Sequence, residues 1–323
     1  MKWIIGDIHG MFDPLKKLIT YLTALEKRPD ADSSDYKIEK FIFVGDYIDR
    51  GPSGKEVVDY LISLEREKIF LCGNHEDMMI NFINNGRELQ EYGNNWFRGN
   101  NGGWQTVLSF MPDLGDTNSA MAALSPETFK PGEKYIEFFK SLKYSHIENA
   151  GGYKFAVTHA GLCDAVDIER QLRIKSHEQL HNLVFNGECD LSETLLWTRN
   201  KHFEKFGDYI LVHGHTPTIT LDREGNGRGG YYDVDSAVPF FKFQGADPVF
   251  DFEKNSKISW CGASMNDLIS INIDTAAAYG YYLSAIGISD NGVKNGAFHC
   301  VRAGGTGTKR GGNEICHEII TVS

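Results

Sequence analysis

A polar cassette recurs directly after short apolar runs and most constrains the fold of this chain. GDIHG occupies residues 6–10, GDYIDRG occupies residues 45–51 and GNHE occupies residues 73–76. Runs this short, bounded by glycine, are typical of buried strands rather than helices. Each cassette joins glycine, which permits a tight turn, to Asp, Asn or His. The pattern predicts a sheet whose strands end in loops that carry functional side chains.

Helices are predicted between these strands. Apolar side chains recur at helical spacing over residues 11–25 and 55–64, and strands are expected at residues 2–5, 41–44 and 69–72. Alternating strands and helices are typical of an α/β fold with a mainly parallel sheet, and ligands gather at the carboxyl ends of its strands. We therefore expect an α/β fold with the site at those ends.

The second half of the chain repeats the pattern with histidine. Strands expected at residues 154–158 and 209–212 run into His159-Ala160-Gly161 and into HGHTP at residues 213–217. Closing strands are expected near residues 270–273 and 281–286. Residues 94–104 look like a loop, and the tail looks loop-like apart from a last strand near residues 315–322. The sequence gives no role for the aromatic run at residues 240–252.

Charge and cysteine usage exclude several classes of protein. The net charge of −11 disfavours nucleic acid or an anionic membrane as a partner. No apolar run approaches the length of a membrane span, and the first cassette at residue 6 leaves no room for a removable signal peptide. The six cysteines form no CxxC pair, so we expect reduced thiols, no disulfide framework and a cytoplasmic location.

Six polar side chains at the predicted strand ends form a candidate metal site. Carboxylate or amide oxygen mixed with imidazole nitrogen suits Mn, Fe or Zn better than Ca, and the absence of thiolates argues against a structural zinc. Two ions held roughly 3.5–4 Å apart by such a set form the clamp used for phosphoryl hydrolysis. The six are Asp7, His9, Asp46, Asn74, His159 and His215, with Asp46 as the expected bridge.

The predicted chemistry also needs a proton donor and cations for the phosphoryl oxygens. A water shared by two divalent ions becomes hydroxide near neutral pH and attacks directly. His75 is the candidate acid that protonates the leaving oxygen, and Asp49 is expected to orient its imidazole. Arg50 and Arg199 offer planar donors for phosphate.

Together these motifs resemble the phosphoprotein phosphatase family of calcineurin-like metallophosphoesterases. GNHEDMM at residues 73–79, NGGW at 101–104, WTR at 197–199 and the HGHTP run look most like the small bacterial and phage serine/threonine phosphatases. The resemblance extends from Gly6 to about residue 286. It implies a β-sandwich flanked by helices, with the site at one edge of the sheets, and it places residues 271–279 at the border of the site.

The resemblance implies a role for each candidate residue. Two divalent ions are expected, Mn first, with Fe or Zn as alternatives. The first would be held by Asp7, His9 and Asp46, and the second by Asp46, Asn74, His159 and His215, while His75 and Asp49 would donate the proton and Arg50 and Arg199 would bind phosphate. The other histidines are expected to be surface or satisfied core residues, namely His146, His177, His181, His202, His213, His299 and His317.

Two departures from the family are visible. Many of its protein phosphatases carry arginine before GNHE, where this chain has Cys72, expected to be a small buried side chain. Residues 218–268 look longer than in the compact phage-type enzymes and could cover the cleft, bind a partner or extend a sheet. We expect one catalytic domain over residues 1–323, with this insertion and a glycine-rich extension at about 288–323.

Three functions stay open from the sequence. The first is a serine/threonine protein phosphatase acting on phosphoproteins, phosphopeptides or small phosphoesters. The second is a diadenosine tetraphosphate hydrolase, a related branch: Asp49 and Glu76 favour the phosphatase, whereas Cys72 favours the hydrolase. The third is an inactive metal-binding scaffold, disfavoured because every expected ligand and both members of the proton-donating pair are present. The sequence does not predict the oligomeric state.

Overall fold

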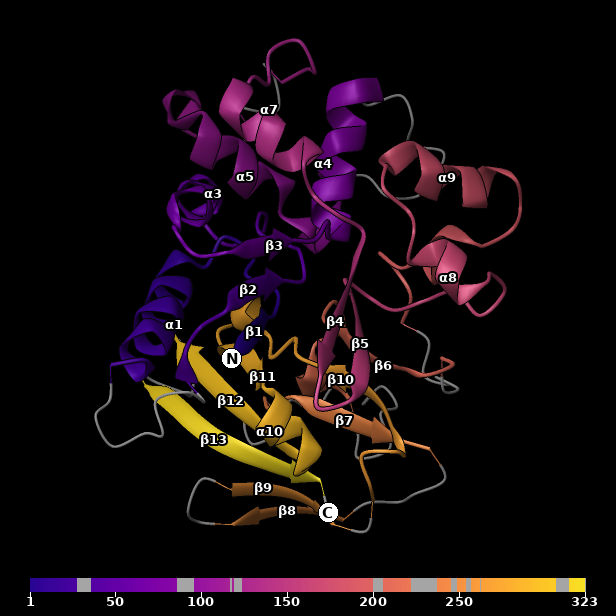
Figure 1. The fold of residues 1–323 in the computed structure, drawn as a ribbon. Helices are drawn as coiled ribbons and strands as arrows, with labels where there is room; N and C mark the ends of the chain where they lie inside the picture. The colour runs from indigo at the N-terminus through magenta and orange to yellow at the C-terminus, as the bar shows by residue number, and fades with distance from the viewer. Residues whose placement is uncertain are drawn as a thin grey trace.

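The computed structural model describes residues 1–27, 36–85, 96–116, 118, 124–199, 206–221, 237–244, 249–253, 257–261, 263–305 and 314–322. Within them the chain forms two facing sheets with helices gathered around them (Figure 1). The helix-flanked sandwich implied by the resemblance is therefore confirmed.

Strands from both halves of the chain meet in each sheet. The eight-stranded sheet has the order β3 (Lys68–Phe70), β2 (Lys40–Phe43), β1 (Lys2–Ile5), β11 (Tyr282–Ile288), β12 (Ala297–Gly304), β13 (Ile315–Val322), β9 (Lys257–Cys261) and β8 (Val249–Glu253). The five-stranded sheet has the order β4 (Ser145–Ala150), β5 (Tyr153–Thr158), β6 (Tyr209–His213), β10 (Leu268–Asn272) and β7 (Phe240–Phe243).

The described residues also form α-helices and short 3-10 turns. The α-helices are α1 (Phe12–Leu25), α3 (Gly54–Ser63), α4 (Asn74–Asn85), α5 (Gly103–Phe110), α7 (Glu133–Lys140), α8 (Ile168–Gln171), α9 (His177–Phe185) and α10 (Asp290–Lys294). The 3-10 turns are η3 (Gly99–Asn101), η4 (Pro112–Leu114), η5 (Leu191–Glu193), η6 (Thr218–Thr220) and η8 (Ala277–Tyr279). In the part of the chain that is described, no helix has the length and apolar character needed to cross a bilayer.

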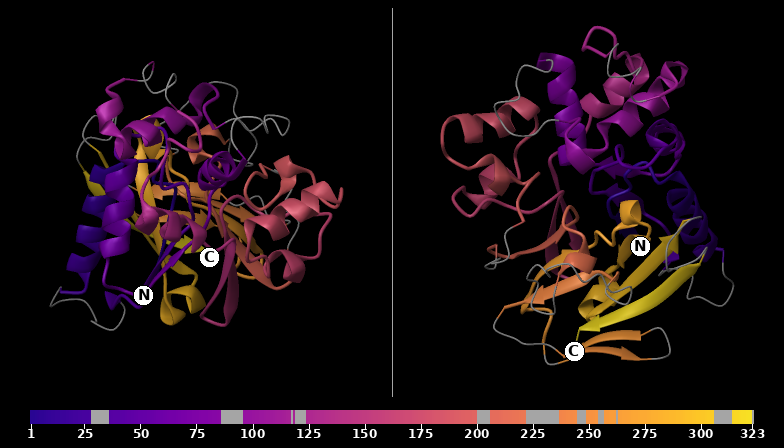
Figure 2. Two further views of the ribbon diagram at one scale, coloured as in Figure 1. Left: turned by 90° about the horizontal axis from the view of Figure 1, so that it is seen from above. Right: turned by 180° about the vertical axis from the view of Figure 1, so that it is seen from behind.

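The central strand β1 shows why the first apolar runs become buried strands. Side chains alternate across a strand, and here both sides are covered. Trp3 and Ile5 join the core under the helices, which includes Leu18 of α1, whereas Ile4 joins the core between the sheets with Phe155. A strand buried on both faces must be apolar throughout, as this one is. Helix α1 packs across β11 and β12 (Figure 2).

The expected mainly parallel sheet is wrong. Strand β1 runs parallel to β2 but antiparallel to β11, and β11, β12 and β13 continue antiparallel. The five-stranded sheet is also mixed, because β4 and β7 pair antiparallel with their neighbours. An apolar run predicts that a strand is buried, but it does not predict the direction in which the strand runs. The sequence pattern therefore could not predict the mixed pairing.

The late segments extend the sheets. The tail contributes β12 as well as β13, so the loop-like expectation is wrong for residues 297–304. In the predicted insertion, β7 joins β10, while β8 and β9 join the edge at β13. Extension of a sheet is thus what its described residues do. The glycine run at residues 225–230 and the tail glycines at residues 307, 311 and 312 lie outside the described residues, and the domain boundaries stay predictions.

The expected loop at residues 94–104 is wrong in its second part. Residues 94 and 95 lie outside the described residues, but η3 occupies Gly99–Asn101 and α5 begins at Gly103. Gly102 adopts φ of +87°, and a Cβ there would lie 2.1 Å from the backbone nitrogen of Arg50. Glycine is therefore required where this turn approaches the second cassette.

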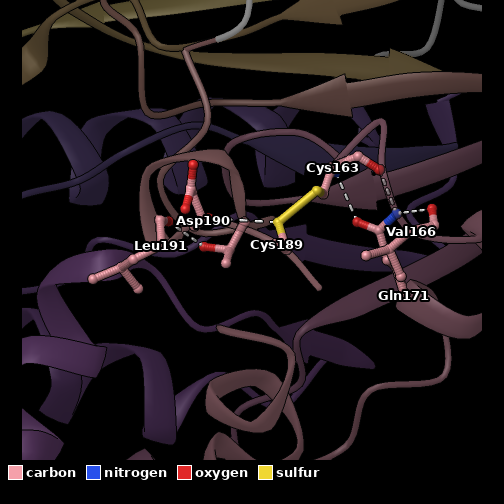
Figure 3. Close-up of a disulfide and its surroundings, with 7 residues drawn as sticks. Cys163, Val166, Gln171, Cys189, Asp190 and Leu191 are labelled. Atoms are coloured by element: carbon pink, nitrogen blue, oxygen red, sulfur yellow. Dashed lines mark hydrogen bonds between the residues drawn. A yellow bond between two sulfur atoms is a disulfide. The ribbon is translucent and has the colours of Figure 1, made fainter. Parts of the chain in front are cut away.

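Cys163 and Cys189 form a disulfide between the segment after β5 and the segment before η5 (Figure 3). The backbone of Cys163 also exchanges hydrogen bonds of 2.8 Å with the side-chain amide of Gln171. The expectation of reduced thiols throughout is wrong for this pair, because a contact across 26 residues is set by the fold and not by a local motif. Disulfides are rare in the cytosol, so the pair does not support the predicted cytoplasmic location. Cys72 is buried and free, as expected.

Candidate active site

The first two cassettes interlock through their backbones at the ends of β1 and β2. The amide of His9 donates to the carbonyl of Asp46 at 2.7 Å, and the amide of Gly51 donates to the carbonyl of His9 at 3.0 Å. His9 and Asp46 have φ of 49° and 52°, left-handed values that are costly for residues with a Cβ. The hydrogen bonds between the two loops hold this strained backbone and direct both side chains toward the same point.

Glu76 anchors the backbone of the second cassette. Its fully buried carboxylate accepts hydrogen bonds from the backbone amides of Asp46 and Tyr47 at 2.8 Å and of Gly73 at 2.9 Å. Burial, with the charge of Asp46, raises the pKa of Glu76 to about 8. Glu76 is the last letter of GNHE and was not predicted as a site residue. The third cassette, GNHE, thus contains the residue that holds the second cassette in place.

Asp46 faces two groups of donor atoms, one with each carboxylate oxygen. Oδ2 lies 3.2 Å from Nε2 of His9, whereas Oδ1 lies 3.5 Å from Nε2 of His159. On the second side, Oδ1 of Asn74 lies 2.9 Å from Nε2 of His159 and 3.0 Å from Nδ1 of His215. The structure therefore brings these predicted ligands together, with Asp46 between the groups.

The remaining predicted ligand, Asp7, joins the site through His215. Its Oδ2 accepts a hydrogen bond of 2.9 Å from the backbone amide of His215. Its Oδ1 and Nε2 of His215 are buried, and neither has a hydrogen-bond partner among the described residues. Burial, then the charges of Asp274 and Asp46, raises the pKa of Asp7 well above its usual value. Buried carboxylates crowded in this way call for positive charge.

The geometry fits two divalent cations. A Cβ at Gly214 would lie 1.9 Å from Oδ1 of Asp7, and one at Gly73 would lie 2.1 Å from Oδ1 of Asp46, so both glycines make room for the donors. The Arg50 guanidinium contacts Nε2 of His9 and lies 3.0 Å from Nε2 of His75. The Arg50 guanidinium thus points both at a predicted metal ligand, His9, and at the predicted acid, His75.

His75 and Asp49 form a buried pair beside these donors. Nδ1 of His75 lies 2.7 Å from Oδ2 of Asp49. The same oxygen accepts from Nε1 of Trp96 at 2.8 Å, and Oδ1 accepts from the hydroxyl of Thr106. The Thr106 hydroxyl in turn accepts from the backbone amide of Asp49 at 2.8 Å. Asp49 is therefore held on three sides and turns the Nε2 side of His75 toward Arg50.

Burial acts on both members of this pair. It lowers the pKa of His75 well below the usual value, against the opposing charge of Asp46. It raises the pKa of Asp49 well above the usual value, against hydrogen bonds from Thr106 and Trp96. A nearby phosphoryl anion favours the cationic form of an imidazole.

The two predicted phosphate-binding arginines differ in position. Arg50 reaches into the donor groups, and its guanidinium also lies over the ring of Tyr279 at 5.7 Å. Arg199 is exposed, and its Nη1 lies 3.5 Å from the hydroxyl of Thr216 in the HGHTP run. Cys72 is 1% exposed and belongs to the core under the helices.

The sequence did not single out three residues that lie beside the predicted pair or beside Asp7. Trp96 and Thr106 hold Asp49, and only a three-dimensional contact identifies them. Asp274 is buried near Asp7, and burial raises its pKa to about 6. It lies in residues 271–279, which the resemblance placed at the border of the site, so its position in that segment was the available signal.

Most of the other histidines have nearby partners. His146 pairs with Glu148 at 3.2 Å, and the rings of His299 and His317 contact each other at 3.1 Å between nitrogens. His213 is buried, with Nδ1 3.0 Å from the carbonyl of Gly214. His202 lies outside the described residues. His177 and His181 also have a partner, because both approach the buried Asp77.

Comparison with known proteins identifies a family. A model of the calcineurin-like phosphoesterase family matches residues 3–250. The asymmetrical bis(5'-nucleosyl)-tetraphosphatase PrpE of Oceanobacillus iheyensis is 26% identical over 223 residues, covering 67% of this chain and 77% of that protein. PrpE of Halalkalibacterium halodurans is 26% identical over 217 residues, covering 66% and 77%. Among solved structures, a serine/threonine phosphatase of Saccharomyces cerevisiae aligns with TM-score 0.42 and 14% identity, covering 100% of this chain and 79% of that chain.

Proposed function

Because the chain belongs to the calcineurin-like phosphoesterase family, which hydrolyses phosphoester bonds at a dinuclear metal site, we propose that it is a serine/threonine protein phosphatase. The observation that carries this proposal is the 2.7 Å contact between His75 and Asp49. A serine alkoxide is a strongly basic leaving group and needs a proton in the transition state, whereas a phosphate leaving group does not. A buried imidazole that is oriented by a carboxylate can donate this proton.

The proposed ion-binding residues are those that converge on Asp46. Asp7, His9 and Asp46 would hold one divalent ion, and Asp46 with three further donors would hold the other, namely Asn74, His159 and His215. Two such ions, with Mn proposed first and Fe or Zn also accommodated, supply Lewis acidity that activates water and neutralises phosphoryl charge.

The remaining steps fall to side chains of this chain. Arg50 is proposed to turn from His9 and His75 toward the equatorial oxygens of the phosphoryl group, and Arg199 to bind that group from the rim. Cationic His75 then donates the proton on Nε2 to the leaving oxygen. Asp49, fixed by its hydrogen bonds, keeps Nδ1 protonated and the ring in place.

A second candidate function is hydrolysis of dinucleoside polyphosphates. Two relatives named as asymmetrical bis(5'-nucleosyl)-tetraphosphatases are each 26% identical over two thirds of the chain, which supports this candidate. Cys72 supports it as well, because one phosphate-binding cation common in protein phosphatases is missing. Such a reaction expels a phosphate group, so it draws less benefit from His75.

A direct competition tests the proposal. Purified protein loaded with Mn is assayed at equal concentrations of a phosphoserine peptide and of diadenosine tetraphosphate, and kcat/KM is compared. We expect a higher value for the phosphopeptide. A clear preference for the dinucleotide would reject the protein phosphatase and support the second candidate. Absence of hydrolysis of either substrate by metal-loaded protein would reject both.

A further inference from the structure

A histidine and carboxylate cluster lies one helical turn beyond the candidate active site. Asp77 follows Asn74 by three residues on α4, which corresponds to a rise of about 4.5 Å along the helix axis. The Asp77 side chain is 3% exposed. Two imidazoles from α9 approach its carboxylate, although 100 residues separate His177 from Asp77 in the sequence. Figure 1 shows α9 beside α4, away from both sheets.

The two imidazoles belong to the same face of α9. His177 and His181 are four residues apart, a spacing that places side chains on neighbouring turns. Nδ1 of His177 lies 2.7 Å from Oδ1 of Asp77, and Nε2 of His181 lies 3.2 Å from Oδ2. The ring centroids are 4.0 Å apart. One atom from each of the three side chains lies within 4.8 Å of the other two.

From this juxtaposition we propose that Asp77, His177 and His181 form a third divalent-cation site, distinct from the dinuclear centre. Bonds of about 2.0 to 2.1 Å around a tetrahedral ion place its ligand atoms about 3.3 Å apart. Nε2 of His181 lies 3.2 and 3.4 Å from the two carboxylate oxygens of Asp77, which matches this distance between ligand atoms. The 2.7 Å contact of His177 needs to widen by about 0.6 Å, within the reach of a side-chain rotation.

Partial exposure leaves a side of the cluster open. The side chains of His177 and His181 are 25% and 28% exposed, so a water or another small ligand can complete the coordination. His177 also lines a cavity of about 230 Å³ between α4 and α7, with Ile83 and Phe139 among its neighbours. A cation can therefore reach the cluster from solvent without opening the core.

The donor set defines the class of ion. Two imidazole nitrogens and one carboxylate oxygen suit Zn, Co, Ni or Cu(II), whereas Mg and Ca prefer sites made only of oxygen. Hydrogen bonds from the histidines hold the pKa of Asp77 below its usual value although burial opposes this, so the carboxylate is ionised. The rival arrangement is a hydrogen-bonded cluster without metal, in which each imidazole donates one N–H to the Asp77 carboxylate. Metal content and chemical protection distinguish the two arrangements.

A cation at this site would join α9 to α4. Because α4 begins with Asn74, a proposed ligand of the dinuclear centre, the third ion would also fix the helix that presents Asn74. The inference requires neither a protein substrate nor a dinucleotide substrate. Its tests measure metal content and chemical protection, so they stay separate from the phosphopeptide assay.

Metal stoichiometry is the first test. After equilibrium dialysis against zinc, we expect three ions per chain in the wild type and two in the His177→Ala/His181→Ala double variant, with equal folding by circular dichroism. The matched control is His146→Ala, which removes a histidine paired with Glu148 on β4 and should keep three. Two ions in the wild type, or three in the double variant, would overturn the proposal.

Chemical protection tests the same site without a variant. Diethyl pyrocarbonate modifies accessible imidazoles, and mass spectrometry locates each modified histidine. With zinc present, we expect modification of His177 and His181 to fall at least fivefold, while His146 is unchanged. Equal modification of the two α9 histidines with and without zinc would overturn the proposal even if the double variant fails to fold.

Discussion

The Asp49→Asn substitution tests the proton-donating pair with little change in shape. Asparagine can keep its oxygen toward His75 and Trp96, the partners of Oδ2, while its amide group faces the hydroxyl of Thr106. The substitution therefore removes the charge that stabilises a cationic imidazole and preserves the surrounding packing. Among the described residues, the Asp49 side chain bonds to His75, Trp96 and Thr106 and to no predicted metal ligand, so metal content should not change.

The magnitude follows from the hydrogen bond that is weakened. A hydrogen bond to a charged group contributes about 1.5 to 3 kcal/mol, and a neutral one about 0.5 to 1.5 kcal/mol. The loss of about 1 to 2 kcal/mol in stabilising cationic His75 corresponds to a decrease in kcat of about 5- to 30-fold. Removal of the acid itself, in His75→Ala, should cost about 10² to 10⁴-fold.

The assay is a series of phosphomonoesters whose leaving groups increase in basicity, from p-nitrophenyl phosphate to a phosphoserine peptide. The loss in Asp49→Asn should grow along the series, because a more basic leaving group depends more on the proton. Asp59→Asn makes the same chemical change in an ion pair with Lys134 outside the site and should leave kcat unchanged. An equal loss for every substrate in Asp49→Asn would refute the assignment of His75 as the acid.

Three further predictions concern stability and metal binding. Burial opposes ionisation of Glu148, but His146 and two lysines hold its folded pKa at about 2, below the ordinary 4.5. Glu148→Gln should therefore lose about 2 kcal/mol of unfolding free energy above pH 4.5, after a discount for solvent screening, and match wild type as the pH falls through 2 in urea titrations. Cys163→Ser opens a loop of 26 residues and should cost about 3.5 kcal/mol, and an unchanged midpoint without reductant would contradict this disulfide. Gly214→Ala places a Cβ 1.9 Å from Oδ1 of Asp7 and should lower bound metal measured by mass spectrometry, with the fold intact.

Local patterns explain which parts of the site could be predicted. Asp7, Asp46 and Asn74 stand directly after strands, and each strand is marked by apolar residues on both sides of the sheet. Because loops at the ends of neighbouring strands meet, the sequence order was enough to expect these side chains together. The sandwich itself came from the family resemblance, since apolar runs alone suggested only alternating strands and helices.

Contacts between distant segments explain what could not be predicted. The indole of Trp96 donates to Asp49, 47 residues away in the sequence, and no periodicity marks that contact. Likewise, nothing around His177 signals Asp77, because their contact depends on how α9 packs beside α4. Strand direction was missed for a related reason: whether β11 runs with or against β1 depends on the path of the chain between them.

The pairing of β1 with β11 also bears on how this protein is made. Lys2 pairs with Ile288, so β1 lacks this neighbour until translation has passed β11. At about 5 to 20 residues per second, that edge waits roughly 15 to 60 s. Unpaired edges of apolar strands promote association with other chains. Chains truncated before β11 are therefore expected to be bound by chaperones or degraded by proteases. They are not expected to fold into enzymes with reduced activity.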